Sequence, residues 1–323
     1  MSILCVGSVA LDSVETPFGN AERVLGGSAV YFGAAATAFH PVQIVGVVGD
    51  DYPMQDLDFL AERGADLSGI ERATGESFFW AGRYHYDLNS RDTLETRLGV
   101  FADFEPKIPE AFRSARYVFL GNIDPELQLD VLDQVEAPDV VACDTMNYGI
   151  EGGRDALLRL LQRVDILLVN DEEARQLAGE SNLLRAARWI QGQGPRIVVV
   201  KKGEHGAILF GEDWIFYVPG YPLEELFDPT GAGDAFAGGF LGYLAKADSV
   251  DPAHLRRAMV YGSALGSFAC EEFSVGRLRD LDNADIADRV RHFRRLTAFE
   301  TDFDDDTLPA ATVSSAGRGG DAP

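Results

Sequence analysis

The 323-residue sequence has few cysteines, and they are not arranged for disulfides or for metal binding. Cys5, Cys143 and Cys270 lie far apart in apolar surroundings, and none belongs to a Cys-x-x-Cys pair. Three widely spaced cysteines do not make a disulfide framework, and reduced thiols are typical of a cytoplasm. We therefore expect a cytoplasmic protein in which all three cysteines are small core residues.

The chain also lacks long hydrophobic runs and an excess of basic residues. No stretch reaches the roughly 18 apolar residues that span a bilayer, and residues 1–7 have no basic leader segment. Acids outnumber bases 52 to 28, which gives a formal net charge of −24 and a pI near 4.5. Such a surface repels nucleic acid and anionic membranes, so we expect neither as a partner.

Three common motifs of nucleotide-binding and metal-dependent enzymes are missing. There is no Walker A lysine motif, and no Gly-x-Gly-x-x-Gly follows the first expected strand, which counts against P-loop and dinucleotide-binding proteins. The five histidines show no metal-ligand spacing and no nucleophile partner. They are His40, His85, His205, His254 and His292. We interpret them as structural or surface residues.

Short apolar segments alternate with helical patterns along most of the chain. We expect a first strand at 3–11, a helix over 28–39 with Ser28 as its N-cap, and five later strands. These strands are expected at 42–48, 117–120, 140–143, 166–169 and 197–200. Near-continuous apolar strands are typical of a parallel sheet buried on both faces. The alternation predicts a doubly wound α/β fold with ligands at the carboxyl ends of its strands.

Two segments break this alternation. Residues 77–89 and 93–101 are rich in aromatic residues and predict antiparallel strands separated by a polar turn. Residues 13–25 have a similar inserted character. From residue 300 the chain carries an acidic run and then Ser, Ala and Gly, so we expect residues 301–323 to be a disordered tail.

The most informative segment is Asp-Pro-Thr-Gly-Ala-Gly-Asp-Ala-Phe-Ala-Gly-Gly-Phe at 228–240. A Gly-Ala-Gly turn that enters a helix presents backbone N–H groups at the positive end of the helix dipole. Gly231 and Gly233 lack a Cβ, so an anion can approach their amides, and Ala232 keeps the turn compact. Asp234 is placed to accept a proton from an attacking alcohol, and an ordinary pKa of about 4 suffices in a loose transition state. The alternative is a plain loop before a helix with a favourable first-turn acid.

The whole run resembles the C-terminal motif of the PfkB family, the ribokinase-like carbohydrate and nucleoside kinases. Weaker similarity extends over residues 2 to about 299. The resemblance implies a ribokinase-like, mostly parallel α/β kinase domain at 1–300, with a small β lid from 13–27 and 76–103. It further implies ATP and Mg²⁺ as cofactors, Asp234 as the catalytic base, residues 231–233 as the anion hole, and a homodimer formed through the lid.

The resemblance also assigns residues to the substrate. Asp12 would bind substrate hydroxyls, since a carboxylate accepts from two vicinal hydroxyls at once; an Asx turn is the alternative. Gly26 and Gly27 match a hinge between lid and core, and Asn122 would face the same cleft. Tyr31 stands where sugar-specific relatives usually have asparagine. It could stack on a flat base, with core packing as the alternative.

Two further motifs border the expected nucleotide site. Asn170 and Glu173 match an Asn-x-x-Glu element that organises Mg²⁺ through water in the family; a helix N-cap with a first-turn acid is the alternative. Lys202, Gly203 and Gly206 match a glycine-punctuated turn beside the phosphates, for which a simple hairpin turn is the alternative.

Other positions of the nucleotide site agree less well with the family. Thr230 belongs to the nucleotide-binding run, and Asp228 is a candidate ligand for a monovalent cation such as K⁺. The family's Gly-Ala segment is Phe-Ser-Val-Gly at 273–276, which puts a monovalent-cation site in doubt. The loop at 144–148, Asp-Thr-Met-Asn-Tyr, replaces the more usual Asp-Pro-Asn with its nearby arginine.

We therefore expect a kinase that transfers the γ-phosphoryl group of ATP to a hydroxymethyl group of a small sugar-like or nucleoside-like substrate. Two alternatives stay open. A nucleoside kinase, for example one acting on an adenosine-like substrate, is favoured if Tyr31 faces the pocket. A non-catalytic nucleotide- or metabolite-binding regulator on the same fold is the other, and the presence of Asp234 with both turn glycines argues against it.

Overall fold

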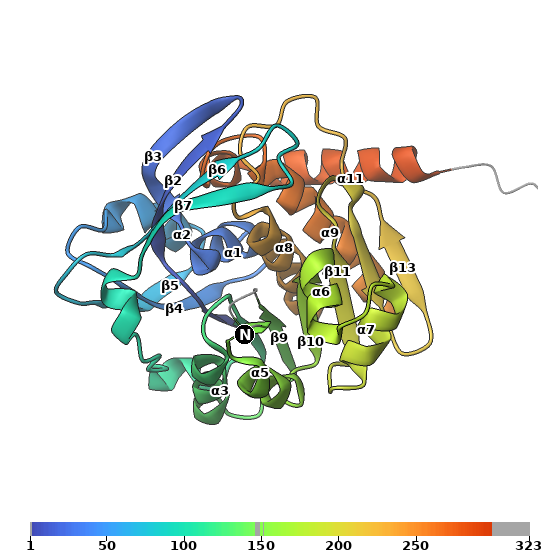
Figure 1. Ribbon diagram of the computed structural model, residues 1–323, viewed down its shortest axis with the longest axis horizontal. Helices are drawn as coiled ribbons and strands as arrows, with labels where there is room; N and C mark the ends of the chain where they lie inside the picture. Colours follow the sequence, from blue (N-terminus) through green and yellow to red (C-terminus); the bar gives the residue numbers. More distant parts are fainter. Residues whose placement is uncertain (1, 146–148, 151, 299–323) are drawn as a thin grey trace, which may run out of the picture.

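The computed structural model describes residues 2–145, 149–150 and 152–298. The predicted tail at 301–323 and residues 146–148 of the expected loop lie outside these ranges. A nine-stranded sheet forms the centre of the molecule, in the spatial order β13-β12-β11-β10-β9-β8-β1-β4-β5 (Figure 1). The strands are β1 (Ile3–Val6), β4 (Val42–Val48), β5 (Asp66–Arg72), β8 (Tyr117–Leu120), β9 (Val140–Asp144), β10 (Ile166–Asn170), β11 (Ile197–Lys201), β12 (Ala207–Phe210) and β13 (Ile215–Val218).

The sheet is parallel from β11 to β5, and β12 and β13 extend it in the antiparallel sense. This arrangement confirms the predicted doubly wound α/β fold. From β1 the chain adds β4 and β5 on one side, and β8 and the later strands on the other. The order therefore reverses between β1 and β8, and such a switch point is where open α/β sheets bind their ligands.

Helices cover both faces of this sheet, with one apolar core on each side (Figure 1). One face carries α1 (Ser28–Ala36), α2 (Asp58–Glu62), α8 (Ala232–Ala247), α9 (Pro252–Ala269), α10 (Gly276–Asp280) and α11 (Asn283–Thr297). The other carries α3 (Pro125–Gln134), α5 (Arg154–Leu161), α6 (Asp171–Ala178) and α7 (Leu183–Gln191). Short 3₁₀ turns occur at Met54–Leu57, Gly99–Asp103, Glu110–Phe112 and Gly203–His205. None of these helices, in the part of the chain that the structure describes, has the length and apolarity needed to cross a membrane.

Helix α8 packs closely on α1 because small residues face each other. A Cβ placed on Gly238 would lie 2.4 Å from the carbonyl oxygen of Phe32, so only glycine allows this approach. Every residue of α1 is buried. The start of α8, which contains the Gly-Ala-Gly turn, is therefore held against the core.

A second, four-stranded sheet has the order β3-β2-β6-β7, and we call it the lid sheet. Its strands are β2 (Ala10–Thr16), β3 (Gly19–Gly26), β6 (Phe78–Tyr84) and β7 (Arg91–Arg97). Figure 1 shows it on the side of α1 and α8, apart from the main sheet. The two inserted segments predicted from the sequence thus pair with each other, β2 with β6 in parallel register.

Two predicted element boundaries near the N-terminus are wrong. The expected strand at 3–11 is two strands, β1 and β2, which lie in different sheets. The chain turns between them because Ser8 and Ser28 exchange backbone-to-hydroxyl hydrogen bonds of 3.1 and 3.0 Å. The helix expected over 28–39 ends at Ala36, and Gly27 is its N-cap in place of Ser28.

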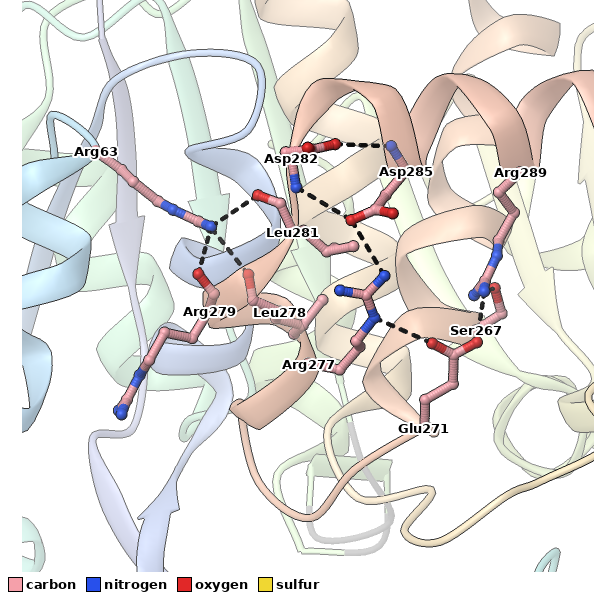
Figure 2. A network of polar contacts seen from close by, with 10 residues as sticks. All are labelled: Arg63, Ser267, Glu271, Arg277, Leu278, Arg279, Leu281, Asp282, Asp285 and Arg289. Atoms are coloured by element: carbon pink, nitrogen blue, oxygen red, sulfur yellow. Dashed lines mark hydrogen bonds and ion pairs between the residues drawn. The ribbon is translucent and has the colours of Figure 1, made fainter.

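Arginine contacts anchor the C-terminal helices (Figure 2). Arg63, directly after α2, donates to three carbonyl oxygens at the end of α10, at 2.9, 2.6 and 2.9 Å. The three acceptors are Leu278, Arg279 and Leu281. A helix leaves its last carbonyls without partners, and Arg63 supplies the missing donors. Glu271 likewise accepts hydrogen bonds from Arg277 and Arg289, which joins the end of α9 to α10 and α11.

Candidate active site

Polar side chains, two of them charged, lie at the carboxyl ends of three neighbouring parallel strands. Asp144 ends β9, Asn170 ends β10 and Lys201 ends β11. Lys201 Nζ and Asp144 Oδ2 form an ion pair of 2.5 Å, and their side chains are only 16% and 7% exposed. Because the ends of parallel strands form the ligand-binding edge of an open α/β sheet, this ion pair marks the candidate site.

The glycine turn at the start of α8 presents two unused backbone donors. Gly231 is the N-cap of the helix with a φ of 73°, a left-handed conformation that favours glycine. Ala232 N donates to Pro229 O at 3.2 Å. Within the described residues, the amides of Gly231 and Gly233 have no acceptor. The turn therefore offers two donors to an anion, not the three expected from its sequence.

Tyr31 supports this turn from the core. A Cβ on Gly231 would lie 2.2 Å from Tyr31 Cγ, so the ring and the turn are in direct contact. The side chain comes from α1 and is 1% exposed. So little of the ring is exposed that, of the two alternatives considered for Tyr31, the structure favours core packing over stacking on a base.

Asp234 is the third residue of α8 and lies beside the charged strand ends. A Cβ on the preceding Gly233 would be 3.1 Å from Lys201 Nζ. Burial and the Asp144 carboxylate raise the pKa of Asp234 to about 7, although Lys201 acts in the opposite direction. This pKa is higher than the ordinary value of about 4, which would already suffice in a loose transition state. A carboxylate that titrates near neutral pH is suited to act as a general base.

Asp12, from β2, faces the same group of carboxylates. Its side chain is buried, and it accepts a hydrogen bond from the Gly27 amide. Burial raises its pKa to about 7, with further contributions from Asp228 and Asp234. A Cβ on Gly26 would lie 2.1 Å from Asp12 Cγ, so glycine is needed where β3 passes this carboxylate. The two adjacent glycines thus fix Asp12 on β2, an inner strand of the lid sheet.

Three of the buried side-chain polar atoms without a hydrogen-bond partner in the described residues come from α1 and from the segments that follow β4 and β8. They are Tyr31 Oη, Tyr52 Oη and Asn122 Oδ1. Burial raises the pKa of Tyr52, and the charge of Asp12 adds to this effect. Buried polar groups are normally satisfied, so unpaired ones indicate a place for a polar ligand or water. No motif in the sequence singled out Tyr52, which follows the acidic pair after β4.

Asn170 and Glu173 form a capping box at the start of α6. Asn170 Oδ1 accepts from Glu173 N at 2.8 Å, and Glu173 Oε2 accepts from Asn170 N at 2.9 Å. Burial and the nearby Asp144 raise the pKa of Glu173 to about 7. No group of three or more His, Cys, Asp or Glu among the described residues could enclose a metal. The donor set fits a hydrated Mg²⁺ held through water, since the carboxylate of Glu173 supplies hard oxygen atoms.

The turn after β11 has the geometry of a hairpin, because β12 returns antiparallel to β11. Gly203 and Gly206 have φ values of 54° and 83°, and Lys202 N donates to Gly206 O at 2.8 Å. The lid sheet reaches this turn: Asn89 Nδ2 donates to Glu204 Oε1 at 3.2 Å. The tip of the lid sheet and the expected phosphate-side turn are therefore in contact.

Asp228 anchors the glycine turn to two other parts of the chain. It is fully buried, and its two carboxylate oxygens accept from Thr230 N at 2.8 Å and Ser274 N at 3.3 Å. Thr230 Oγ1 in turn bonds the hydroxyl of Tyr84 in the lid sheet at 3.3 Å. Both Asp228 oxygens thus have backbone partners, and its role as a K⁺ ligand stays a prediction.

The lid sheet contributes an aromatic and cationic cluster that sequence reasoning largely missed. Trp80 pairs with Asp12 between β6 and β2, which places the two residues side by side on the sheet. The Arg91 guanidinium lies 5.5 Å from the Trp80 ring and 6.0 Å from the Tyr84 ring. The positive charge of Arg91 also lowers the pKa of Asp234, so Arg91 is close enough to interact electrostatically with the candidate site. The aromatic composition of this strand was visible in the sequence. The register of the strand, which decides that Trp80 lies beside Asp12, was not.

Lys201 was missed as well, although a signal was present. It is the charged end of the apolar run at 197–200, and the ends of such strands carry ligand-binding residues. The resemblance pointed to Lys202 instead.

Comparison with known proteins agrees with this geometry. The model of a family described as pfkB family carbohydrate kinase matches residues 2–280. A cytidine kinase from Thermococcus kodakarensis is 32% identical over 247 residues, which are 75% of this chain and 87% of that protein. Aminoimidazole riboside kinase from Salmonella enterica, solved with aminoimidazole riboside and an ATP analogue, has a TM-score of 0.69 at 19% identity, covering 91% of this chain and 99% of that one. An E. coli protein assigned as ribokinase II, solved with ATP and Mg²⁺, has a TM-score of 0.73 at 20% identity, covering 90% and 99%. These two structures share the fold of this chain.

Proposed function

The chain belongs to the pfkB family of carbohydrate kinases, phosphotransferases with an alcohol acceptor, and we propose that it phosphorylates a hydroxymethyl group of a nucleoside-like substrate with ATP. One observation carries this proposal. Two free amides, those of Gly231 and Gly233, lie beside Asp234 at the carboxyl edge of the parallel sheet. An anion site next to a titratable base is what phosphoryl transfer to an alcohol requires.

In this reaction Asp234 accepts the proton of the acceptor hydroxyl as the new bond to phosphorus forms. The Gly231 and Gly233 amides donate to the oxygens of the transferred group, where charge is spread in the transition state. Asp12 and Asn122 hold other hydroxyls of the acceptor and fix its orientation. Positioning of this kind accounts for a large part of the rate in phosphoryl transfer.

ATP and Mg²⁺ are the cofactors that we propose, in line with the E. coli ribokinase II solved with both. When bound, Mg²⁺ neutralises phosphate charge. Glu173 is placed to hold the hydrated ion, and Asn170 to keep the Glu173 carboxylate in position. The turn of Gly203 and Gly206 would border the phosphates.

The lid sheet supports a nucleoside over a free sugar. Trp80 pairs with Asp12, and the Arg91 guanidinium lies over both the Trp80 and Tyr84 rings, so an aromatic surface adjoins the carboxylate proposed to bind the sugar hydroxyls. A flat base can stack on such a surface. The relative from T. kodakarensis is a cytidine kinase, and the S. enterica structure contains a riboside. Trp80 takes the stacking role first considered for Tyr31.

A coupled assay of ADP release tests the proposal with a panel of acceptors. The panel contains cytidine, uridine, adenosine, aminoimidazole riboside, ribose and fructose, and mass spectrometry locates the new phosphate. We expect turnover with at least one riboside and a much lower kcat/KM with free sugars. Nucleotide binding without turnover of any acceptor would contradict the proposal and favour a non-catalytic regulator.

The Trp80→Ala variant tests the stacking role. We expect it to raise the KM for the preferred riboside by about two- to tenfold, since stacking on an aromatic ring contributes about 0.5–1.5 kcal/mol beyond area burial. Tyr86→Ala is the matched control, because that lid residue is 85% exposed. Equal effects of the two substitutions on KM would argue against Trp80 as the stacking residue.

A further inference from the structure

The Lys201 side chain extends from the end of β11 to the glycine turn at the start of α8. A Cβ on Gly233 would lie 3.1 Å from its Nζ, so the ammonium group adjoins the backbone whose two amides are free. The side chain is 16% exposed and its partner Asp144 only 7%. The cation therefore lies at the bottom of the site and not on the surface of the protein.

A buried ion pair is weak evidence for a purely structural role. Removing two charges from water costs several kcal/mol, and apolar side chains of similar size often stabilise a fold equally well or better. Lys201 and Asp144 come from β11 and β9, which β10 already joins through backbone hydrogen bonds. The main sheet does not need this ion pair to connect the two strands.

The charges around Lys201 show what its ammonium group could bind. Burial lowers the pKa of Lys201, but Asp144 and Glu173 outweigh this effect, so the pKa lies above its ordinary value and the group stays protonated. The carboxylates of Asp144, Glu173 and Asp234 all act on it. A phosphate group that enters such an acidic site needs a fixed cation beside the donor amides.

We propose that the Lys201 ammonium group binds the oxygens of the phosphoryl group during its transfer, and that Asp144 is a positioning residue that holds it beside Gly233. This inference rests on the proposed kinase activity. The bond between the γ-phosphorus and the bridging oxygen of ADP breaks, and a bond from phosphorus to the acceptor oxygen forms. The acceptor proton goes to Asp234, and Lys201 keeps its own protons throughout.

The test compares Lys201→Met, Lys201→Ala and Lys201→Arg with wild type in full steady-state kinetics. We expect Lys201→Met to lower kcat by about 10² to 10³, the range for loss of one donor to a developing oxyanion. The KM for ATP should change by less than about threefold, because the contact strengthens in the transition state. Lys201→Arg should keep at least about a tenth of the wild-type kcat because it retains the charge. Lys246→Met, at the far end of α8, is the matched control for the loss of one lysine charge.

Two further readouts separate a catalytic contact from a structural one. Methylammonium should raise the kcat of Lys201→Ala at least about tenfold and leave Lys246→Met unchanged, since it can enter the space of the missing side chain. Tight inhibition by ADP with Mg²⁺ and tetrafluoroaluminate, which mimics the group in transit, should be lost in Lys201→Met while binding of ADP alone persists. If Lys201→Met fails to fold, Lys201→Met with Asp144→Asn removes both charges together and takes its place.

The outcomes distinguish this inference from the proposed function. A wild-type protein that phosphorylates no acceptor overturns both. An active wild type whose Lys201→Met variant keeps more than about a third of its kcat, or whose Lys201→Ala variant does not respond to methylammonium, overturns only the role of Lys201.

Discussion

Replacing Asp234 by Asn should abolish most activity and at the same time stabilise the protein at neutral pH. The pKa of Asp234 is raised from 3.8 to about 7 in the folded protein, chiefly by burial and by Asp144. The fold therefore prefers the protonated carboxyl group. Relative to a neutral side chain, Asp234 has no effect on stability below pH 3.8, destabilises the fold increasingly as the pH rises, and reaches its full effect above about pH 7.

The magnitude follows from the size of this shift. Each pKa unit corresponds to about 1.4 kcal/mol, so a shift of about three units has an upper limit of about 4 kcal/mol. Asp234 keeps partial contact with solvent, which reduces this figure. We expect the Asn variant to be more stable than wild type by about 1 to 3 kcal/mol at pH 8, and by much less at pH 4.5.

Urea unfolding without nucleotide at pH 8, 6 and 4.5 measures this difference. The exposed Asp213→Asn variant controls for the loss of one negative charge. In parallel, the kcat of Asp234→Asn should fall by about 10² to 10⁴, the usual range for loss of a general base. An Asn variant no more stable than wild type at pH 8, or one whose advantage is the same at pH 4.5, would refute the reasoning. Near-normal turnover would remove Asp234 from the role of base.

Three further predictions concern the turn, the substrate carboxylate and the C-terminal helices. Gly231→Ala should lower kcat more than about tenfold and destabilise the fold by about 1 to 3 kcal/mol, because its Cβ would lie 2.2 Å from Tyr31 Cγ at a φ of 73°; kinetics and thermal melting measure both effects. Asp12→Asn should raise the KM for the acceptor at least about tenfold while the Kd for ADP stays unchanged by calorimetry, since only hydroxyl binding is lost. Arg63→Ala should cost about 2 to 3 kcal/mol in urea unfolding, because three carbonyl oxygens at the end of α10 lose their donor (Figure 2), and Arg63→Lys should recover only part of it.

The main sheet was predictable because its strands are buried on both faces. The strands expected at 42–48 and 117–120 match β4 and β8 to the residue, since apolar runs begin and end where burial does. The division of the run at 3–11 was not predictable. Nothing within it marks a change of sheet, and the contact that redirects the chain involves Ser28, twenty residues later.

Only the part of the candidate site that is formed by consecutive residues was predictable from the sequence. The run at 228–240 identified the glycine turn and Asp234, because the chemistry lies in consecutive residues. The pKa of Asp234 depends on Asp144 and Lys201, which other strands bring to it. Whether Lys201 or Lys202 adjoins the glycine turn depends on which of the two side chains faces that turn at the end of β11. The register of the strand decides this, and the sequence alone does not give the register.

The arrangement of charges explains why the site is expected to favour a metal-bound nucleotide. Asp12, Glu173 and Asp234 all have pKa values of about 7, raised mainly by burial, so the site holds carboxylates that are costly to ionise. A free nucleotide adds negative charge next to them. Mg²⁺ and the ammonium group of Lys201 would both neutralise this charge and so reduce its repulsion by the carboxylates. The same burial that makes Asp234 a base near neutral pH thus makes the ionised carboxylates destabilising to the fold. Binding of ADP together with Mg²⁺ should therefore stabilise the fold more than binding of ADP alone does.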